Sequence, residues 1–431
     1  MSSAATTWPV NDAAAQAPAR PPRSYIRRVV DATMVRWGAR LGVLWIAVLA
    51  LLAVFAPFIA NSHPILIKLD GKWSSPMLRH LTPSDATLAV AFLAAAALSL
   101  LRRVSVARRV LAFLGVLLIA GVLSAIFIEP PTPVVFEQYR EARAQGRVQS
   151  VIHTLIPYSP SDRLRDRPGS AVVAPWWAPR AEHPQDHAAG HWLGTESNGS
   201  DLASRMIHAS RIALAIGFIA TGIALVIGVV IGGVMGYFSG IVDLVGMRLV
   251  EVFEFIPQLF LLLMFVAFFP GDRPEIFRIN DFAVSLPRIY LMMAIIGLTG
   301  WGGYARFIRA EFLKLRQQDF VQAAIACGLP LRSILFRHML PNGLTPVLVS
   351  ASFGVAGAIL AEATLSFLGL GLIDEPSWGQ LLNQATRATG AFTWWLAVFP
   401  GLAIFLTVFA YNLVGESLRD AIDPHVSRNA G

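Results

Sequence analysis

The chain has 431 residues, of which 55% are hydrophobic and only 14% charged, and its formal net charge is +8 at pH 7. Soluble domains average about 25% charged residues, so a soluble chain of this composition would expose apolar patches and aggregate. These figures exclude a cytosolic enzyme, a nucleic-acid-binding protein and a disordered protein. The single cysteine, Cys327, excludes an intramolecular disulfide and any multi-cysteine metal site.

The composition divides the chain into four regions. Residues 1–22 are rich in Ala, Pro and Gln without periodicity, which predicts a disordered tail. Residues 23–128 hold three apolar runs and should form an N-terminal membrane region, residues 129–205 a loop or insertion outside the membrane, and residues 206–425 a core of five further spans. The first apolar run begins too late and is too long for a signal peptide, so we expect it to remain as a membrane anchor.

A helix that spans a bilayer needs about 20 mainly apolar residues. Eight segments meet this requirement, so the sequence predicts an all-α polytopic membrane protein with about eight transmembrane helices. The predicted spans are residues 41–60, 86–101, 109–128, 211–235, 243–269, 289–305, 345–368 and 394–414.

The distribution of charge predicts the orientation in the membrane. Residues 20–40 carry six arginines, and the loop 306–344 is also rich in Lys and Arg, so the positive-inside rule places both in the cytoplasm. Eight spans then leave both termini in the cytoplasm and residues 129–205 outside. Arg205 and Arg211 oppose the rule, because they flank a helix end that is predicted to lie outside.

The segment 129–190 is rich in Pro, Arg and Trp and shows no sustained hydrophobic period. It predicts an irregular periplasmic loop that packs on the membrane domain. A small α/β insertion is the alternative, although no clean strand pattern supports it.

The longest cytoplasmic loop, Asp319 to Gly343, predicts two short helices across the membrane surface. Asp319 can cap the first helix, and Gly328 should end it in the left-handed conformation that favours glycine. Pro330 suits the first turn of the second helix. Pro341 and the asparagine after it should stop that helix before the next span. Such an element could sit in a pocket of a partner and transmit a push to two spans.

This loop resembles the EAA loop of ABC importer permeases, in which Glu-Ala-Ala is followed after three residues by Gly and further on by Leu-Pro. The matching residues here are Gln322, Ala323, Ala324, Gly328, Leu340, Pro341 and Asn342, and Gln322 stands where the family usually has Glu. The resemblance implies that these residues couple the chain to an ATPase. We expect both alanines to face the partner.

Other motifs resemble the dipeptide/oligopeptide subfamily of these permeases, and specifically its second, C-type member. The resemblance covers about residues 190–425, whereas the family usually has one span before this core and the present chain has three. The motifs are HWLGT at 191–195 with Asp201, LSFLGLG at 365–371, PSWG at 376–379, and FPG at 399–401 followed by Asn412, Gly415, Arg419-Asp420 and Asp423-Pro424.

The resemblance implies a type I ABC importer permease core in a bacterial inner membrane, surrounded by lipid. It implies a peptide substrate delivered by a periplasmic substrate-binding protein, a second homologous permease subunit, and two ATPase subunits docked on residues 319–343. The chain has no phosphate loop of the GxxxxGK[ST] type, so ATP must be bound by partner subunits. We therefore expect no enzymatic activity, no cofactor and no nucleic-acid partner for the chain itself.

Three acidic residues need a separate interpretation. Glu362 lies in the seventh predicted span, where an ionisable side chain costs several kcal/mol unless it meets water or a partner. It is a candidate for the translocation pathway, and a hydrogen bond between packed helices is the alternative. Glu251 and Glu254 follow Arg248 at i+3 and i+6, and a local Arg–Glu pair is the favoured interpretation.

Two other functions have less support in the sequence than the importer. His183, His187 and His191 have a spacing that would suit zinc on a helix, but Pro184 and Gly190 interrupt such a helix, so neither a metal site nor a membrane enzyme is favoured. A proton-coupled secondary transporter would need buried acidic relays and internal repeats. The sequence shows one strong intramembrane acid and no repeat.

Overall fold

The computed structural model describes residues 25–422 with several gaps. The expected tail at 1–22, together with His183 and His187, lies outside the described residues. The gaps fall at residues 102–103, 129–134, 165–173, 176–189, 270, 272–274, 280–281, 286, 372–374 and 388–392.

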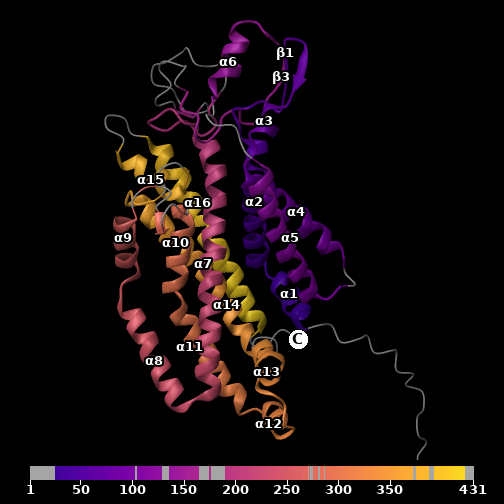
Figure 1. Ribbon diagram of the computed structural model, residues 1–431, viewed down its shortest axis with the longest axis vertical. Coiled ribbons are helices and arrows are strands. Elements are labelled where there is room, and N and C mark those ends of the chain that lie inside the picture. The colour runs from indigo at the N-terminus through magenta and orange to yellow at the C-terminus, as the bar shows by residue number, and fades with distance from the viewer. Residues whose placement is uncertain are drawn as a thin grey trace, which may run out of the picture.

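Long helices lie side by side and build most of the molecule (Figure 1). Within the described residues, seven helical segments are long and apolar enough to cross a membrane, or up to eight if a bent pair is one span, which agrees with the predicted number. They are α2 (Trp37–Ile59), α4 (Pro83–Leu100), α5 (Val106–Phe127), α7 (Leu202–Phe238), α10–α11 (Arg288–Thr299 and Trp301–Arg316), the segment Leu331–Phe367 that includes α14 (Leu340–Phe367), and α16 (Trp394–Ile422).

The predicted span 243–269 is not one continuous helix. It consists of α8 (Gly240–Phe255) and α9 (Gln258–Phe268), which are bent by 66° at the break. Pro257 explains the bend, because proline has no N–H for the helix and disfavours helical dihedrals at the preceding residue. Ile256 accordingly adopts φ −85° and ψ 119°.

Helix α7 lies at the centre of the core, between α10–α11 and α14. Gly228, Gly232 and Gly236 form one face of α7, and a methyl group on any of them would overlap the backbone of α11. The small residues therefore allow the two backbones to approach closely, as small-xxx-small faces do in membranes. The glycines of this run therefore serve the packing of α7 on α11.

A small lobe lies at one end of the molecule. It contains β1 (Leu66–Leu69), β2 (Lys72–Ser74) and β3 (Val148–Ile152) in an antiparallel sheet of order β2-β1-β3, with α3 (Pro76–Arg79) and α6 (Glu137–Ala144). The expectation of an irregular loop is wrong for this part of 129–190, and the alternative of a small α/β insertion describes α6 and β3 better. Strand β3 pairs with β1, which lies in the connection between α2 and α4. The residues around β3 therefore give no indication of its partner.

The sheet of the lobe connects two of the regions that the composition indicates. Strands β1 and β2 come from the region 23–128, and β3 comes from the region 129–205. The two regions therefore share one sheet. The helical fold also contains β-structure, because a second hairpin, β4 (Glu275–Ile279) with β5 (Phe282–Ser285), connects α9 to α10.

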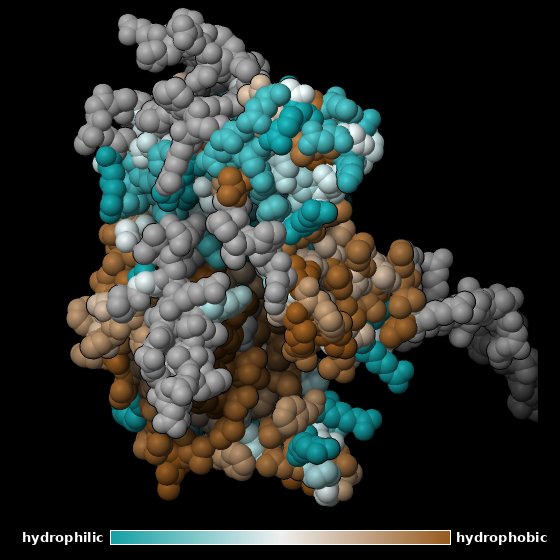
Figure 2. Space-filling model, turned by 45° about the horizontal axis from the view of Figure 1, so that its top comes forward, coloured by the Kyte–Doolittle hydropathy of each residue, from teal (hydrophilic) through white to brown (hydrophobic). Residues whose placement is uncertain are grey.

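The two ends of the molecule differ, and we call them the lobe end and the loop end. The loop end carries α12 (Asp319–Ala326) and α13 (Leu331–Ser333) (Figure 1). Helix α1 (Tyr25–Val35) also lies there, and Arg36 beyond it forms an ion pair with Asp420 near the end of α16. Figure 2 shows a polar lobe above a broad band of apolar side chains, as expected of a protein whose body lies in lipid.

Candidate functional site

The predicted coupling loop begins with α12, whose end has the conformation that the sequence predicts. Gly328 has φ +72°, and its N–H donates to the carbonyl of Ile325 at 2.9 Å. The N–H of Leu329 donates to the carbonyl of Ala324 at 3.2 Å, which completes a Schellman motif. This closed end fixes the direction in which the chain leaves the helix.

The start of α12 differs from the prediction. The N-cap residue is Gln318, without a side-chain cap, and Asp319 lies in the first turn. The expectation that Asp319 caps the helix is therefore wrong by one position. Its carboxylate still favours the helix, because negative charge is stabilising at the positive end of the helix dipole.

The two alanines of the motif face in different directions. Val321 and Ala324 are buried against the protein's own core, with exposed fractions of 0% and 6%, whereas Ala323 and Gln322 are exposed. The expectation that Ala324 faces a partner is wrong. In a helix of 3.6 residues per turn, positions i and i+3 share a face, and Val321 anchors that face inward.

Gln322 has a specific contact of its own. Its Nε2 donates to the carbonyl oxygen of Arg316, the last residue of α11, at 2.7 Å. A glutamate in its ionised form could not donate this bond. The departure from the family residue therefore has a local structural consequence, which is to fasten α12 to the end of α11.

Leu340, Pro341 and Asn342 do not stop a helix as expected. The chain continues from α13 through a π-helical turn, η1 (Ile334–Met339), directly into α14. The Leu340 N–H donates to the carbonyl of Leu335, and Asn342 Nδ2 donates to the carbonyl of His338 at 2.7 Å. The wider turn accommodates a proline at the start of α14, where its missing N–H disturbs the helix least.

An apolar surface surrounds α12 at the loop end. We call it the loop surface and define it by four exposed hydrophobic side chains together with Ala323. The four are Phe320, Ile325, Leu329 and Leu331. Exposed groups of apolar side chains with a polar rim are typical of protein interaction sites.

The HWLGT motif has a structural role at the lobe end. His191 Nδ1 lies 2.7 Å from Oδ2 of Asp201, and Asp201 Oδ1 accepts the Ser204 N–H at 2.7 Å as the N-cap of α7. Gly194 has φ +85°, and the Thr195 carbonyl accepts a hydrogen bond from Trp395 Nε1 at 3.0 Å. The motif thus closes a loop over the start of α7 and attaches it to α16. Among the described residues, no group of three potential ligands could hold a metal ion.

Arg205 has a buried acidic partner that sequence reasoning missed. It forms an ion pair with Glu196 and donates to Gln380 Oε1 at 3.0 Å and to the Pro160 carbonyl at 3.2 Å. Burial raises the pKa of the Glu196 carboxyl, and the charge of Arg205 opposes this shift. The signal that could have found the pair was the arginine itself, since it opposes the positive-inside rule.

Glu362, the candidate pathway residue, is buried. Its exposed fraction is 3%, and its Oε1 accepts a hydrogen bond from the Ser366 hydroxyl at 2.6 Å. A second hydrogen bond connects it to Ser377 in the PSWG motif. These contacts correspond to the packing alternative, in which Glu362 holds the lobe end of α14 to the following segment.

The predicted local Arg–Glu pair at i, i+3 is confirmed, whereas Glu254 has a different partner. Arg248 Nη1 lies 2.5 Å from Glu251 Oε2 on the exposed side of α8. Glu254 instead pairs with Arg306 of α11. It therefore connects two helices, which spacing along one helix could not reveal.

Comparison with known proteins identifies the chain. Residues 228–428 match the family described as the binding-protein-dependent transport system inner membrane component. The chain is 37% identical to the oligopeptide transport system permease protein of Haemophilus influenzae, over 59% of this chain and 79% of that protein. The chain belongs to this family of ABC importer permeases. It is therefore a multi-pass membrane transport protein and not an enzyme, and a proton-coupled secondary transporter is not favoured.

The chain is also similar to two other proteins. An inner membrane ABC transporter permease of Escherichia coli is 29% identical over 89% of this chain and 92% of that protein. An alignment of that length includes most of the residues before 190, so that permease shares the additional N-terminal region. The inward-facing MetNI methionine ABC transporter matches 52% of this chain and 98% of that chain, with 19% identity and a TM-score of 0.37.

Proposed function

We propose that this permease is one of two related membrane subunits of a peptide importer. Relatives of the chain are named as transport permeases for oligopeptides in Haemophilus influenzae, dipeptides in Bacillus subtilis and glutathione in Pectobacterium atrosepticum. All three substrates contain peptide bonds, so a short peptide or peptide-like molecule is the substrate class. A periplasmic binding protein delivers it, and ATP is hydrolysed by two partner subunits.

In this proposal the loop end faces the cytoplasm and the lobe end faces the periplasm. The arginines around α1 and the basic residues of the 306–344 loop support this orientation through the positive-inside rule. ATP is available on the cytoplasmic side, where the loop surface would meet the ATPase. Both termini of the chain then lie in the cytoplasm.

The observation that carries the proposal is the loop surface on a helix that is held firmly by its own chain. Val321 and Ala324 anchor α12 inward, Gln322 attaches it to α11, and the chain runs without interruption from α13 into α14. A force on α12 would therefore reach a membrane-spanning helix directly. ATP-driven closure of the ATPase subunits would bias the spans between inward-facing and outward-facing states.

One face of α14 supports the presence of a second permease. Between residues 353 and 367 its exposed residues are spaced by four and three positions, so they form a single stripe along that part of the helix. Glu362 lies on a different face, so the stripe replaces it as the candidate for the pathway and the subunit contact. The stripe consists of Phe353, Gly357, Leu360, Thr364 and Phe367.

The test compares two neighbouring alanines. Ala323→Glu places a charge on the loop surface, so it should leave the chain stable in the membrane but abolish co-purification of the ATPase subunits and ATP-dependent peptide uptake. Ala324→Glu buries a charge in the chain itself, so it should lower the amount of folded permease first. Wild-type docking and uptake in Ala323→Glu and in Gly328→Asp would overturn the proposal.

A further inference from the structure

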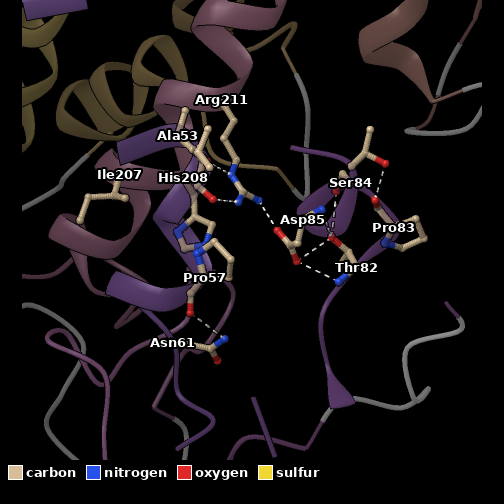
Figure 3. A network of polar contacts seen from close by, with 12 residues as sticks. Ala53, Pro57, Asn61, Thr82, Pro83, Ser84, Asp85, Ile207, His208 and Arg211 are labelled. Atoms are coloured by element: carbon tan, nitrogen blue, oxygen red, sulfur yellow. Dashed lines mark hydrogen bonds and ion pairs between the residues drawn. The ribbon is translucent and has the colours of Figure 1, made fainter. Parts of the chain in front are cut away.

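Arg211 lies near the lobe end of α7, where a positive charge opposes the orientation of the membrane spans. Figure 3 shows its guanidinium directed away from α7, between the backbone of α2 and the start of α4. The Arg211 side chain is 17% exposed and its acidic partner Asp85 is 7% exposed. A charge this well buried needs compensation from its surroundings.

The first part of that compensation comes from a proline in α2. Pro57 has no N–H, so the carbonyl of Ala53, four residues earlier, lacks its intrahelical donor. Arg211 Nε donates to this carbonyl at 2.5 Å, and Nη2 lies 3.4 Å from the carbonyl of Val54. The arginine thus satisfies an acceptor that the helix cannot satisfy itself, which attaches α7 to α2.

The second part of the compensation comes from α4. Helices α4 and α5 form a helical hairpin, which we call the additional hairpin because the family usually has one span, not three, before the core. Asp85 Oδ1 accepts a hydrogen bond from Arg211 Nη1 at 2.5 Å. Its other oxygen, Oδ2, accepts the Thr82 N–H at 2.8 Å and the Thr82 hydroxyl at 2.7 Å, as part of the capping box of α4. The carboxylate is therefore fixed by its own helix and oriented toward Arg211.

The hairpin depends on this contact because little else of it is buried. Only 6% of the apolar window of α4, and 6% of that of α5, is buried inside the protein. Lipid chains are as apolar as leucine, so apolar packing by itself gives helices little reason to associate in a membrane. The contacts near the lobe end include an edge-to-face pair of Phe55 in α2 and Phe92 in α4, with ring centroids 5.3 Å apart.

We propose that the Asp85–Arg211 ion pair is a permanent joint, which makes the hairpin α4–α5, helix α2 and the lobe end of α7 move as one body throughout the transport cycle. Separating α4 from α7 would leave a buried guanidinium without its counter-ion, and separating α2 from α7 would leave the Ala53 carbonyl without a donor. Both losses disfavour an open state. Arg211 and Asp85 are therefore positioning residues. Alternating access must arise from helices moving against this body.

The first experiment locks the hairpin while leaving the joint intact. The double variant Phe55→Cys/Phe92→Cys is prepared in a Cys327→Ala background, and a short thiol-specific bifunctional reagent joins α2 to α4. We expect the cross-linked permease, in its complete complex, to retain the uptake of the untreated double variant. Each single-cysteine variant, treated in the same way, is the control. Uptake that stops on cross-linking and returns when the link is cleaved would show that the hairpin swings, and would overturn the proposal.

The second experiment weakens the joint itself. Asp85→Asn keeps the acceptor for Thr82 but removes the charge, so it should lower both the 55–92 cross-linking yield and uptake. Glu251→Gln removes the acid of an exposed Arg–Glu pair and should change neither. Wild-type yield and uptake in Asp85→Asn would contradict the proposal.

The inference rests on transport by this permease but on no particular substrate or partner. Absence of peptide uptake in the wild-type complex would count against the proposed function alone, because the effect of Asp85→Asn on the 55–92 cross-linking yield would still test the joint. The locking experiment decides the matter even where Asp85→Asn fails to accumulate, since it leaves both charges in place.

Discussion

The core helix α7 and the additional helix α5 have nearly the same hydropathy, 2.7 and 2.8 over their most apolar windows, yet 39% of that window is buried in α7 and 6% in α5. Both sequences predict a membrane span, and both form a helix that is long and apolar enough to be one. The difference lies in the small residues that α7 presents to α11 and in its polar bonds at the lobe end. Apolar content places a helix in the bilayer, whereas close packing and buried polar contacts decide what it packs against.

The largest expected effect contrasts one glycine in each region. Gly232 of α7 meets the backbone of α11 at Ala305, whereas a Cβ on Gly115 of α5 would meet no atom within 4 Å. Gly232→Val should force the two helices apart and cost more than about 3 kcal/mol, because a backbone contact cannot give way as a side chain can. Gly115→Val should leave stability nearly unchanged. The thermal unfolding midpoint of the purified protein measures both, and equal shifts would refute the contrast.

A smaller effect is expected from the two helix caps. Asp201→Ala removes the N-cap of α7, worth about 1 kcal/mol, and also leaves the buried imidazole of His191 without its acceptor, a further loss of about 1–3 kcal/mol. Thr82→Ala removes the side-chain cap of α4 and should cost about 1 kcal/mol or less. Denaturation of the two variants under the same conditions should therefore rank Asp201→Ala as the more damaging change. The opposite ranking would show that the hairpin contributes more to stability than its burial indicates.

The smallest effect concerns pH and a second buried histidine. His63, in the lobe, stacks on His80 with ring centroids 3.8 Å apart, and among the described residues its ring nitrogens have no hydrogen-bond partner. Burial, and then the neighbouring His80, lower the pKa of His63 to about 4, although the charge of Asp162 opposes this shift. The unfolded chain therefore binds a proton at His63 more readily than the folded protein between about pH 6.5 and pH 4. The stability that the neutral ring contributes is present above this range and is lost as the pH falls through it.

His63→Phe should consequently reduce the fall in thermal unfolding midpoint between pH 7 and pH 5. The ring of phenylalanine keeps an aromatic neighbour for His80, Phe136 and Tyr139 but cannot bind a proton. An unchanged pH dependence in His63→Phe would show that the lobe does not limit stability in acid.

Several features could be predicted from the sequence because they depend on neighbouring residues alone. Eight apolar segments agree with the number of helices in the described residues that are long and apolar enough to cross a membrane, with the bent pair α8–α9 taken as one. Gly328 gave the end of α12, since a positive φ favours glycine wherever it occurs. The local pair of Arg248 and Glu251 follows from helix geometry in the same way. The motifs of the core gave the family, which comparison with known proteins then confirmed.

Other features were decided by the tertiary structure. Strand β3 exists because β1 offers an edge to it from another part of the chain. Ala324 faces inward because Val321 anchors the same side of α12, and Pro341 is accepted within a helix because a π-helical turn precedes it.

The sequence by itself determined that this protein crosses the membrane many times, where its helices lie in the chain, and which family it belongs to, because apolar length, turn conformation and short motifs are local properties. Only the tertiary structure decided how the additional hairpin is attached, since Asp85 and Arg211 are 126 positions apart and neither residue indicates the other. Arg205 and Arg211 are charges that the sequence leaves unexplained at the lobe end. The fold brings an acidic partner to each of them, Glu196 and Asp85 respectively. The physical reason is that a buried charge must find its partner in space, and proximity in space is set by packing rather than by order along the chain.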